Sequence, residues 1–419
     1  MPEQEILNIS GLKTYFRSDE MMVKAVDELS FSVQKGETIG IVGESGSGKS
    51  VTALSVMRLV PQPGGEIVGG QIRYHSPKSS FSADLLNLSE GAMQKVRGNE
   101  IAMIFQEPMT SLNPVYPCGN QVAETLMLHR DMNWEEARQE VLGLFEKVQL
   151  PDVKRIYEAY PHQLSGGQKQ RVMIAMALSC NPGLLIADEP TTALDVTVQK
   201  ATLDLMSELK NEYGTAIMFI SHDLSVIAEI ADRVVVMFKG KIVEQGPVKD
   251  IFLNPQHPYT KGLLSCRPPL DFRLNRLPVV ADFMEVRHAE GQEPEIIEKK
   301  VSIKEVLNKS KVTKQAMRGR LEKLQTQEPF LKVENLKTWF PVSFEIFPGE
   351  TLGLVGESGC GKTTLGRSIL GLTPTAGGKV LYQGKNLLEM DAKAWKKVRK
   401  EMQIIFQDPY SSLNPRMTI

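Results

Sequence analysis

Apolar runs of strand length recur along the first 250 residues, and segments with helical spacing lie between them. Three of these runs cover residues 38–42 (TIGIV), 184–187 (LLIA) and 216–220 (AIMFI). Short, continuous apolar runs are typical of strands that are buried on both faces of a parallel sheet. A similar run, IAMIF, ends at Gln106. The pattern predicts an α/β fold whose buried strands end at polar residues.

Other segments extend this prediction. Residues 5–42 contain further strand candidates, and residues 234–247 (VVVMFKGKIVEQGP) read as a hairpin. Apolar residues recur at helical spacing in 51–60, where we expect a helix that stops at Pro61. They do so again in 119–150, which predicts a second, all-helical subdomain.

One stretch occurs twice. Both copies fit G-x-x-x-x-G-K-[ST], both follow an apolar run (TIGIV, TLGLV), and both precede a segment that predicts a helix. Glycines let backbone N–H groups turn around an anion, and the lysine reaches the terminal phosphates. The alternative, a Gly/Ser-rich turn before a helix, does not account for two full matches. The nucleoside triphosphate sites predicted here comprise Gly43, Glu44, Ser45, Gly46, Ser47, Gly48, Lys49 and Ser50, and Gly356, Glu357, Ser358, Gly359, Cys360, Gly361, Lys362 and Thr363.

Composition narrows the class of protein. The formal net charge is -1, which gives no reason to expect nucleic acid as a partner. The four cysteines are scattered without C-x-x-C spacing, so we expect free thiols in a reducing compartment. The N-terminus does not predict a signal peptide, and the apolar runs are too short to cross a membrane. We expect a cytosolic protein that acts on a membrane only through a partner.

A segment of different composition follows the first domain, and after it motifs from the start of that domain occur a second time. Residues 285–328 are dense in Glu and Lys and read as a linker that is partly helical at best. After them, LKTWF resembles the earlier LKTYF, and QIIFQDPYSSLNP resembles MIFQEPMTSLNP. We therefore predict a first domain at 1–270, a charged linker at 271–328 and the N-terminal part of a second copy at 329–419.

Five features of the first domain occur in a fixed order: Lys49 in its loop, Gln106, LSGGQ at 164–168, ADEP at 187–190, and His222. This set resembles the nucleotide-binding domain of ATP-binding cassette (ABC) proteins. The resemblance implies a P-loop NTPase fold with a RecA-like core, a β-subdomain and a helical subdomain. The segments YPHQLSGGQ and QHPYTKGLL resemble the ATPases of the peptide/nickel importer family. The duplication is similar to its fused two-cassette members, which import glutathione and related peptides.

The resemblance implies roles for single residues, with ATP and Mg²⁺ as cofactors. The hydroxyls of Ser50 and Thr363 would complete a Mg²⁺ shell, and Asp188 would bind the ion through water. Gln106 would reach the Mg²⁺ or the attacking water. Glu189 would orient and polarise that water, and His222 would contact the γ-phosphate.

Further roles concern the adenine and a second domain. Tyr15 or Phe16 is the candidate aromatic residue for stacking on adenine, and an ordinary strand aromatic is the alternative. Asp195 resembles the residue that links the two sites of a dimer. The signature loop would contact the γ-phosphate bound to an opposite domain, and it consists of Ser165, Gly166, Gly167 and Gln168.

The second copy contains neither LSGGQ nor an Asp-Glu strand end, and we interpret it as incomplete. Neither site would then be complete within one chain, so we expect hydrolysis to need a second copy or another ATPase that supplies LSGGQ. The resemblance also implies integral-membrane permease subunits, a periplasmic solute-binding protein, and a place at the cytoplasmic face of a bacterial inner membrane. Two alternatives stay open: a soluble ABC ATPase without a permease, and a truncated product that binds ATP without efficient turnover.

Overall fold

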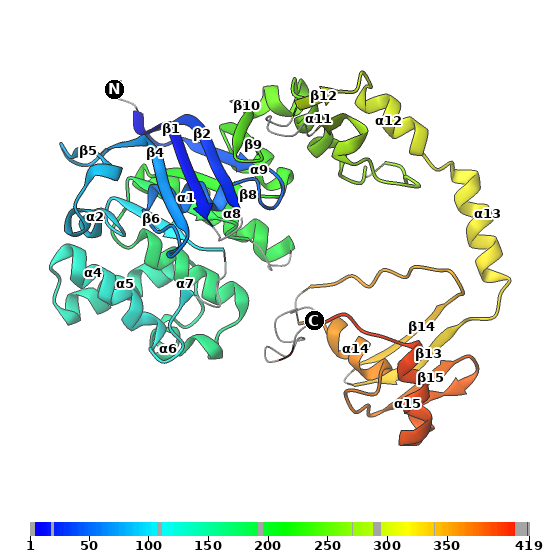
Figure 1. The fold of residues 1–419 in the computed structure, drawn as a ribbon. Coiled ribbons are helices and arrows are strands. Elements are labelled where there is room, and N and C mark those ends of the chain that lie inside the picture. Colours follow the sequence, from blue (N-terminus) through cyan, green and yellow to red (C-terminus); the bar gives the residue numbers. More distant parts are fainter. Residues whose placement is uncertain are drawn as a thin grey trace. The chain divides into compact units, whose positions relative to one another are not determined.

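The computed structural model describes residues 5–17, 21–106, 111–191, 196–269, 271–287, 295–338, 340–357, 359–406 and 417. The chain divides into two compact units, Met1–Lys311 and Val312–Ile419 (Figure 1). The domain boundaries expected at residues 270 and 328 stay predictions.

A largely parallel sheet forms the centre of the first unit, with the strand order β10-β9-β3-β8-β7-β6. Only the pairing of β10 with β9 is antiparallel, and it forms the hairpin that the sequence predicts. The strands are β3 (Thr38–Val42), β6 (Ile101–Ile104), β7 (Leu184–Asp188), β8 (Ala216–Ser221), β9 (Arg233–Phe238) and β10 (Lys241–Pro247). The predicted α/β fold is confirmed.

Both faces of this sheet are covered by apolar side chains. In β8, Met218 belongs to one buried cluster, whereas its neighbour Phe219 belongs to the other. Because side chains alternate between faces along a strand, a continuous apolar run is what burial on both faces requires. The alternation explains why the run at 216–220 contains no polar residue.

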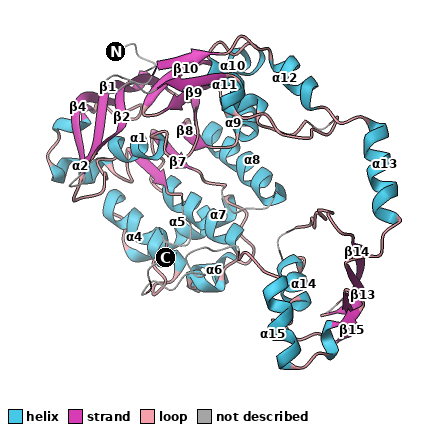
Figure 2. Cartoon of the chain, turned by 45° about the vertical axis from the view of Figure 1, so that its right-hand side comes forward, coloured by secondary structure: helices cyan, strands magenta, loops and turns pink. Residues whose placement is uncertain are grey.

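A second sheet, with the order β2-β1-β4-β5, packs against one face of the central sheet through the cluster that contains Leu7, Ile41 and Met218. Figure 2 shows its strands side by side above helix α1. The elements are β1 (Glu5–Arg17), β2 (Met22–Gln34), α1 (Lys49–Val56), β4 (Gly65–His75), β5 (Ser82–Asp84) and α2 (Glu90–Val96).

Helices cover the other face, and four of them, α4 to α7, gather into one group (Figures 1 and 2). This group is the predicted helical subdomain. Asn133 begins α5 with a reciprocal capping box to Glu136, which satisfies backbone N–H groups at the helix start. The helices are α4 (Cys118–Arg130), α5 (Trp134–Lys147), α6 (Val153–Glu158), α7 (Gly166–Leu178), α8 (Val196–Tyr213), α9 (Leu224–Ile230), α10 (Val248–Leu253) and α11 (Pro258–Ser265).

The predicted linker contains regular structure. Phe283 and Met284 are buried in the first unit, at the start of the hairpin of β11 (Met284–Arg287) and β12 (Glu295–Glu298). Two helices follow, α12 (Ile303–Ser310) and α13 (Lys314–Gln325), and neither has a buried residue. The prediction of a partly helical segment agrees with these helices.

The second unit holds one antiparallel sheet, with the order β14-β13-β15-β16. Residues 351–357, which contain TLGLV, are exposed and form no strand, although the matching TIGIV forms the buried strand β3. The two similar runs therefore differ in structure. The elements are β13 (Leu331–Lys337), β14 (Pro341–Ile346), α14 (Lys362–Ile369), β15 (Gly377–Tyr382), β16 (Lys385–Asn386) and α15 (Ala392–Glu401). Across the described part of the chain, no helix combines the length and apolar character that a membrane span requires.

Candidate functional site

The first glycine-rich loop joins the buried strand β3 to helix α1, as the sequence predicts. Two of its glycines lie where a side chain cannot fit. A Cβ atom on Gly43 would lie 2.3 Å from the carbonyl oxygen of Met237, and one on Gly48 would lie 2.2 Å from that of Ala25. Gly48 also has a φ of 101° and begins α1, a conformation that L residues with side chains rarely adopt. The glycines therefore let the loop pack against two neighbouring strands.

Lys49 is folded back onto this loop. Its Nζ atom donates to the carbonyl oxygens of Gly43 at 2.8 Å and Glu44 at 2.9 Å. The residue is only 6% exposed, and burial lowers its pKa, while the charges of Glu189 and Asp188 oppose that shift. The loop thus holds an ammonium group at its centre, in the position that suits phosphate oxygens.

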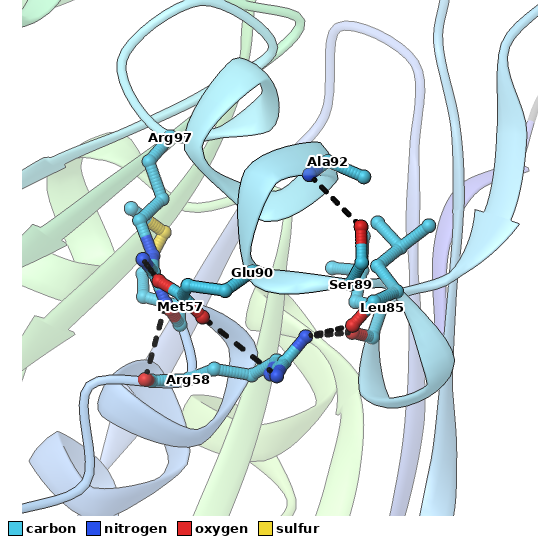
Figure 3. A network of polar contacts seen from close by, with 8 residues as sticks. Met57, Arg58, Leu85, Ser89, Glu90, Ala92 and Arg97 are labelled. Atoms are coloured by element: carbon cyan, nitrogen blue, oxygen red, sulfur yellow. Dashed lines mark hydrogen bonds and ion pairs between the residues drawn. The ribbon is translucent and has the colours of Figure 1, made fainter.

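The other end of α1 is held by arginines (Figure 3). Arg97 donates from Nε to the carbonyl oxygen of Met57 at 2.9 Å, and its guanidinium also pairs with Glu90. Arg58 has a φ of 51°, so the helix cannot continue through it. The helix therefore ends at Val56, and the expectation that it runs to Pro61 is wrong.

The buried carboxylate Asp188, at the end of β7, faces the start of α1. The Ser50 hydroxyl donates to its Oδ1 atom at 3.0 Å. Burial raises the pKa of Asp188 to about 6, and the Ser50 hydrogen bond opposes the shift. Two oxygen ligands of this kind, beside a phosphate loop, are a donor set that fits Mg²⁺.

Glu189 follows directly and points to different partners. Its φ is 47°, an uncommon value for a residue with a side chain and one often found at functional sites. Its Oε2 atom accepts from Gln106 Nε2 at 3.2 Å and lies 3.1 Å from His222 Nδ1. The ends of β6, β7 and β8 therefore bring together the three residues that the sequence analysis names as catalytic. Their assigned roles stay predictions.

The signature loop opens helix α7. The Ser165 hydroxyl accepts from the Gln168 N–H at 3.3 Å, and the Gln168 side chain accepts from the Ser165 N–H at 3.0 Å. This reciprocal cap shapes the helix N-terminus, where Gly166 and Gly167 leave the backbone open to an anion.

The two aromatic candidates for adenine stacking lie side by side on β1 but contact different groups. The Tyr15 hydroxyl donates to Asp27 at 2.7 Å, which fixes that ring. Phe16 is partly buried beside Gly65, where an added Cβ atom would come within 2.8 Å of its ring. Neither contact decides between them, so the assignment of Phe16 stays a prediction.

In the second loop, Lys362 makes the same contacts as Lys49, but the buried strand that precedes the first loop is missing from the described residues. Lys362 Nζ donates to the carbonyl oxygens of Gly356 and Glu357, both at 2.7 Å, and it lies 3.5 Å from Cys360 Sγ. Thr363 follows in α14, and the strand that precedes the first loop has no counterpart here. Two predicted site residues, Ser358 and Asp195, lie outside the described residues.

A contact between α11 and the first loop was missed by sequence reasoning. The hydroxyl of Tyr259, in α11, accepts from the backbone N–H of Glu44 at 2.8 Å. The sequence analysis noted the segment QHPYTKGLL only as a mark of resemblance. No local pattern connects two residues that are 215 positions apart, so only the tertiary structure reveals this contact.

Comparison with known proteins shows which families and proteins this chain resembles. The ABC transporter family model matches residues 26–192 and 340–419, and the model for the oligopeptide/dipeptide transporter C-terminal region matches residues 243–289. The glutathione import ATP-binding protein GsiA of Pectobacterium atrosepticum is 44% identical over 437 residues, which cover 100% of this chain. GsiA of Escherichia coli strain K12 is 46% identical over 440 residues and 99% of this chain. The chain spans 66% of the length of each relative.

Solved structures agree on the fold. The dimeric structure of the ATP-binding cassette MJ0796 in a post-hydrolysis state, bound to ADP and Pi, is 26% identical with a TM-score of 0.51. It covers 58% of this chain and 99% of its own. The cbiO1 protein of Clostridium perfringens, 24% identical with a TM-score of 0.50 over 60% of this chain and 92% of its own, shows the fold alone. Because the matching family model covers more than half of its residues, the chain belongs to the ABC transporter family.

Proposed function

We propose that the first unit binds and hydrolyses ATP, and that hydrolysis powers the import of peptides or related small solutes through a partner permease. The observation that carries the ATPase proposal is the convergence of Gln106, Glu189 and His222 at the ends of three neighbouring strands. They lie at the edge of the sheet formed by the carboxyl ends of its parallel strands, where the Ser50 hydroxyl of the phosphate loop donates to Asp188. A carboxylate, an imidazole and an amide beside a phosphate cradle suit the activation of a water molecule for phosphoryl transfer.

In the proposed reaction, Glu189 accepts a hydrogen bond from the attacking water and holds it in line with the γ-phosphorus. The water oxygen bonds to that phosphorus as the bond to the β–γ bridging oxygen breaks. ADP and inorganic phosphate leave, and the proton passes to Glu189 or to solvent. Gln106 and His222 fix the orientation of the Glu189 carboxylate through their contacts with its Oε2 atom.

Ser50 and Asp188 would hold Mg²⁺, which supplies charge neutralisation at the β- and γ-phosphates when it is bound. Lys49 contributes a second positive charge from within the loop. Its folded-back position means that it needs little rearrangement to reach a phosphate oxygen.

The signature loop is proposed to act on a nucleotide held by another domain. Ser165 and the glycines after it begin α7 as an anion-binding helix N-terminus, and this loop is separate in sequence from the loop that holds Lys49. The similar cassette MJ0796 has a dimeric structure with ADP and Pi. A second copy of this chain, or a different ATPase, would supply the loop that completes the site.

The import role rests on the relatives. The residues at 243–289 match the C-terminal region of oligopeptide/dipeptide transporters, and the similar GsiA proteins are named for glutathione import. Peptides and glutathione share a backbone of amides and carboxylates, which defines the proposed substrate class. The permease and a periplasmic solute-binding protein would select among these solutes, and the chain would sit at the cytoplasmic face of the inner membrane.

Phosphate release from purified protein with ATP and Mg²⁺, measured from nanomolar to micromolar protein, tests the ATPase proposal. We expect turnover per chain to rise with protein concentration, because two chains must meet to complete a site, and EDTA to abolish it. Constant turnover in a strictly monomeric sample would contradict the shared site. ATP binding without hydrolysis at any concentration would contradict the ATPase assignment itself.

A further inference from the structure

The segment that follows the ATPase core contacts the phosphate loop directly. Tyr259, the second residue of α11, is completely buried, and its hydroxyl accepts from the Glu44 N–H at 2.8 Å. Its ring packs against Phe238 with centroids 4.5 Å apart. A buried tyrosine that places its hydroxyl on a backbone N–H holds that peptide group in one orientation.

The peptide group between Gly43 and Glu44, whose N–H Tyr259 holds, also accepts from Lys49 Nζ at the Gly43 carbonyl oxygen, at 2.8 Å. Glu44 receives a hydrogen bond at its carbonyl oxygen from Lys49 Nζ, while its N–H is held by Tyr259. Tyr259 therefore reaches the ammonium group through a single intervening residue. A loop that holds its phosphate-binding cation in place before the ligand arrives loses less conformational freedom on binding.

Tyr259 is itself held by the start of α11. His257 caps this helix, with Nδ1 accepting from the Tyr259 N–H at 3.1 Å. The Glu244 carboxylate, on β10, accepts from the backbone N–H groups of Gln256 and His257 at 2.8 and 3.0 Å. The triplet His257-Pro258-Tyr259 thus works as one unit: the histidine and proline set the helix start, and the tyrosine reaches the loop.

A second contact from the same segment reaches the other side of the site. The Arg267 guanidinium, just after α11, bonds to the Asp223 carboxylate and the Ser225 hydroxyl. Asp223 is the N-cap of α9 and follows His222 directly. One short segment therefore touches the residues on both sides of the proposed γ-phosphate position, the loop residue Glu44 and the neighbour of His222.

We propose that residues 257–267 form a clamp, a segment that holds two parts of the nucleotide site in position. Tyr259 is the positioning residue for the phosphate loop. Arg267 is the positioning residue for the end of β8, which His222 follows. This inference rests on the proposed ATPase function and assigns to the C-terminal segment a part in building the site. The segment matches the oligopeptide/dipeptide transporter C-terminal region, so the clamp would couple that region to nucleotide binding.

The test combines hydrogen exchange with nucleotide binding in Tyr259→Phe, which removes only the hydroxyl. Tyr213→Phe is the matched control, because its hydroxyl accepts from Lys147 on the helical face instead. We expect exchange at the Glu44 amide to rise roughly tenfold in Tyr259→Phe, and the dissociation constant for a fluorescent ATP analogue to rise several-fold, with neither change in the control. Arg267→Met should raise exchange around residues 222–225 and leave Glu44 protected.

Unchanged Glu44 exchange and unchanged affinity in Tyr259→Phe would overturn the inference. So would an equal loss of protection throughout the first unit, because that result would indicate a general loss of stability. The exchange measurement needs no nucleotide. If the unmodified protein failed to bind ATP, the proposed function would fail, whereas the positioning contact would still be tested.

Discussion

Lys49 in the first phosphate loop and Lys362 in the second donate to the same pair of loop carbonyls, at 2.7 to 2.9 Å in both cases. Their surroundings differ. The strand before Lys49 is buried between two others, and the Asp188 carboxylate lies beside the next residue, Ser50. The run before Lys362 is exposed, and Val355 within it is 92% exposed. The lysine geometry is therefore local to the motif, whereas the burial of the loop and its neighbouring carboxylate depend on segments far away in the sequence.

The difference between the two apolar runs has a clear cause. TIGIV becomes β3 because β8 and β9 pair with it on either side, and both strands come from residues beyond 210. Among the described residues, no strand pairs with the TLGLV run. A parallel strand depends on its neighbours for every ladder hydrogen bond, so two similar runs can form a strand in one place and an exposed segment in the other.

The largest expected difference is in the free energy of unfolding when a carboxylate is placed in the TIGIV run or in the TLGLV run. Ile41→Asp would place an unpaired carboxylate at a fully buried position of β3, and we expect a loss of roughly 5 kcal/mol in the free energy of unfolding. Val355→Asp should change stability by less than about 0.5 kcal/mol. Urea unfolding followed by circular dichroism measures both. Similar losses in the two variants would mean that the second run is packed in solution.

The next contrast concerns catalysis. Glu189→Gln keeps the size of the side chain but removes the charge that would polarise water, so we expect phosphate release to fall by about 10²- to 10⁴-fold. Glu357→Gln, in the second loop, is the matched control and should leave turnover unchanged, because its side chain is exposed and only its carbonyl oxygen contacts Lys362. Retained turnover in Glu189→Gln would remove this residue from the proposed mechanism.

A smaller effect follows from the carboxylate that only the first site has. Burial raises the pKa of Asp188 from 3.8 to about 6, so its contribution to stability is present at low pH and is lost as pH rises through about 6. Asp188→Asn in EDTA without nucleotide should therefore stabilise the protein by on the order of 2 to 3 kcal/mol at neutral pH, and by much less near pH 4. The measurement is the difference in unfolding free energy between the variant and the unmodified protein across this range. A difference that does not change with pH would contradict the raised pKa.

The sequence could predict the features that depend on nearby residues. The loop between β3 and α1 and the helical subdomain both follow from the spacing of residues. The α/β fold follows from the short apolar runs. In these cases the residues that form a structure lie within a few positions of one another, so the pattern contains the information.

Features that depend on distant residues could not be predicted in this way. The sequence alone does not show that Gln106 and His222 meet at the Glu189 carboxylate. The family resemblance implied only that the three residues serve the same ATP site. The contact of Tyr259 with Glu44 was not expected at all. The early end of α1 at Val56 depends on the left-handed backbone of Arg58, for which the helical spacing of 51–60 gives no sign.

Turnover in the pair Lys49→Ala and Lys362→Ala tests the central claim, that the first loop is the hydrolytic one. Phosphate release would be measured in the full chain at a protein concentration where the unmodified protein is active. We predict that Lys49→Ala loses at least roughly 10- to 100-fold of the turnover, because a charge-assisted contact with phosphate is removed, while Lys362→Ala retains it within about twofold. Equal losses in the two variants, or a greater loss in Lys362→Ala, would contradict the account.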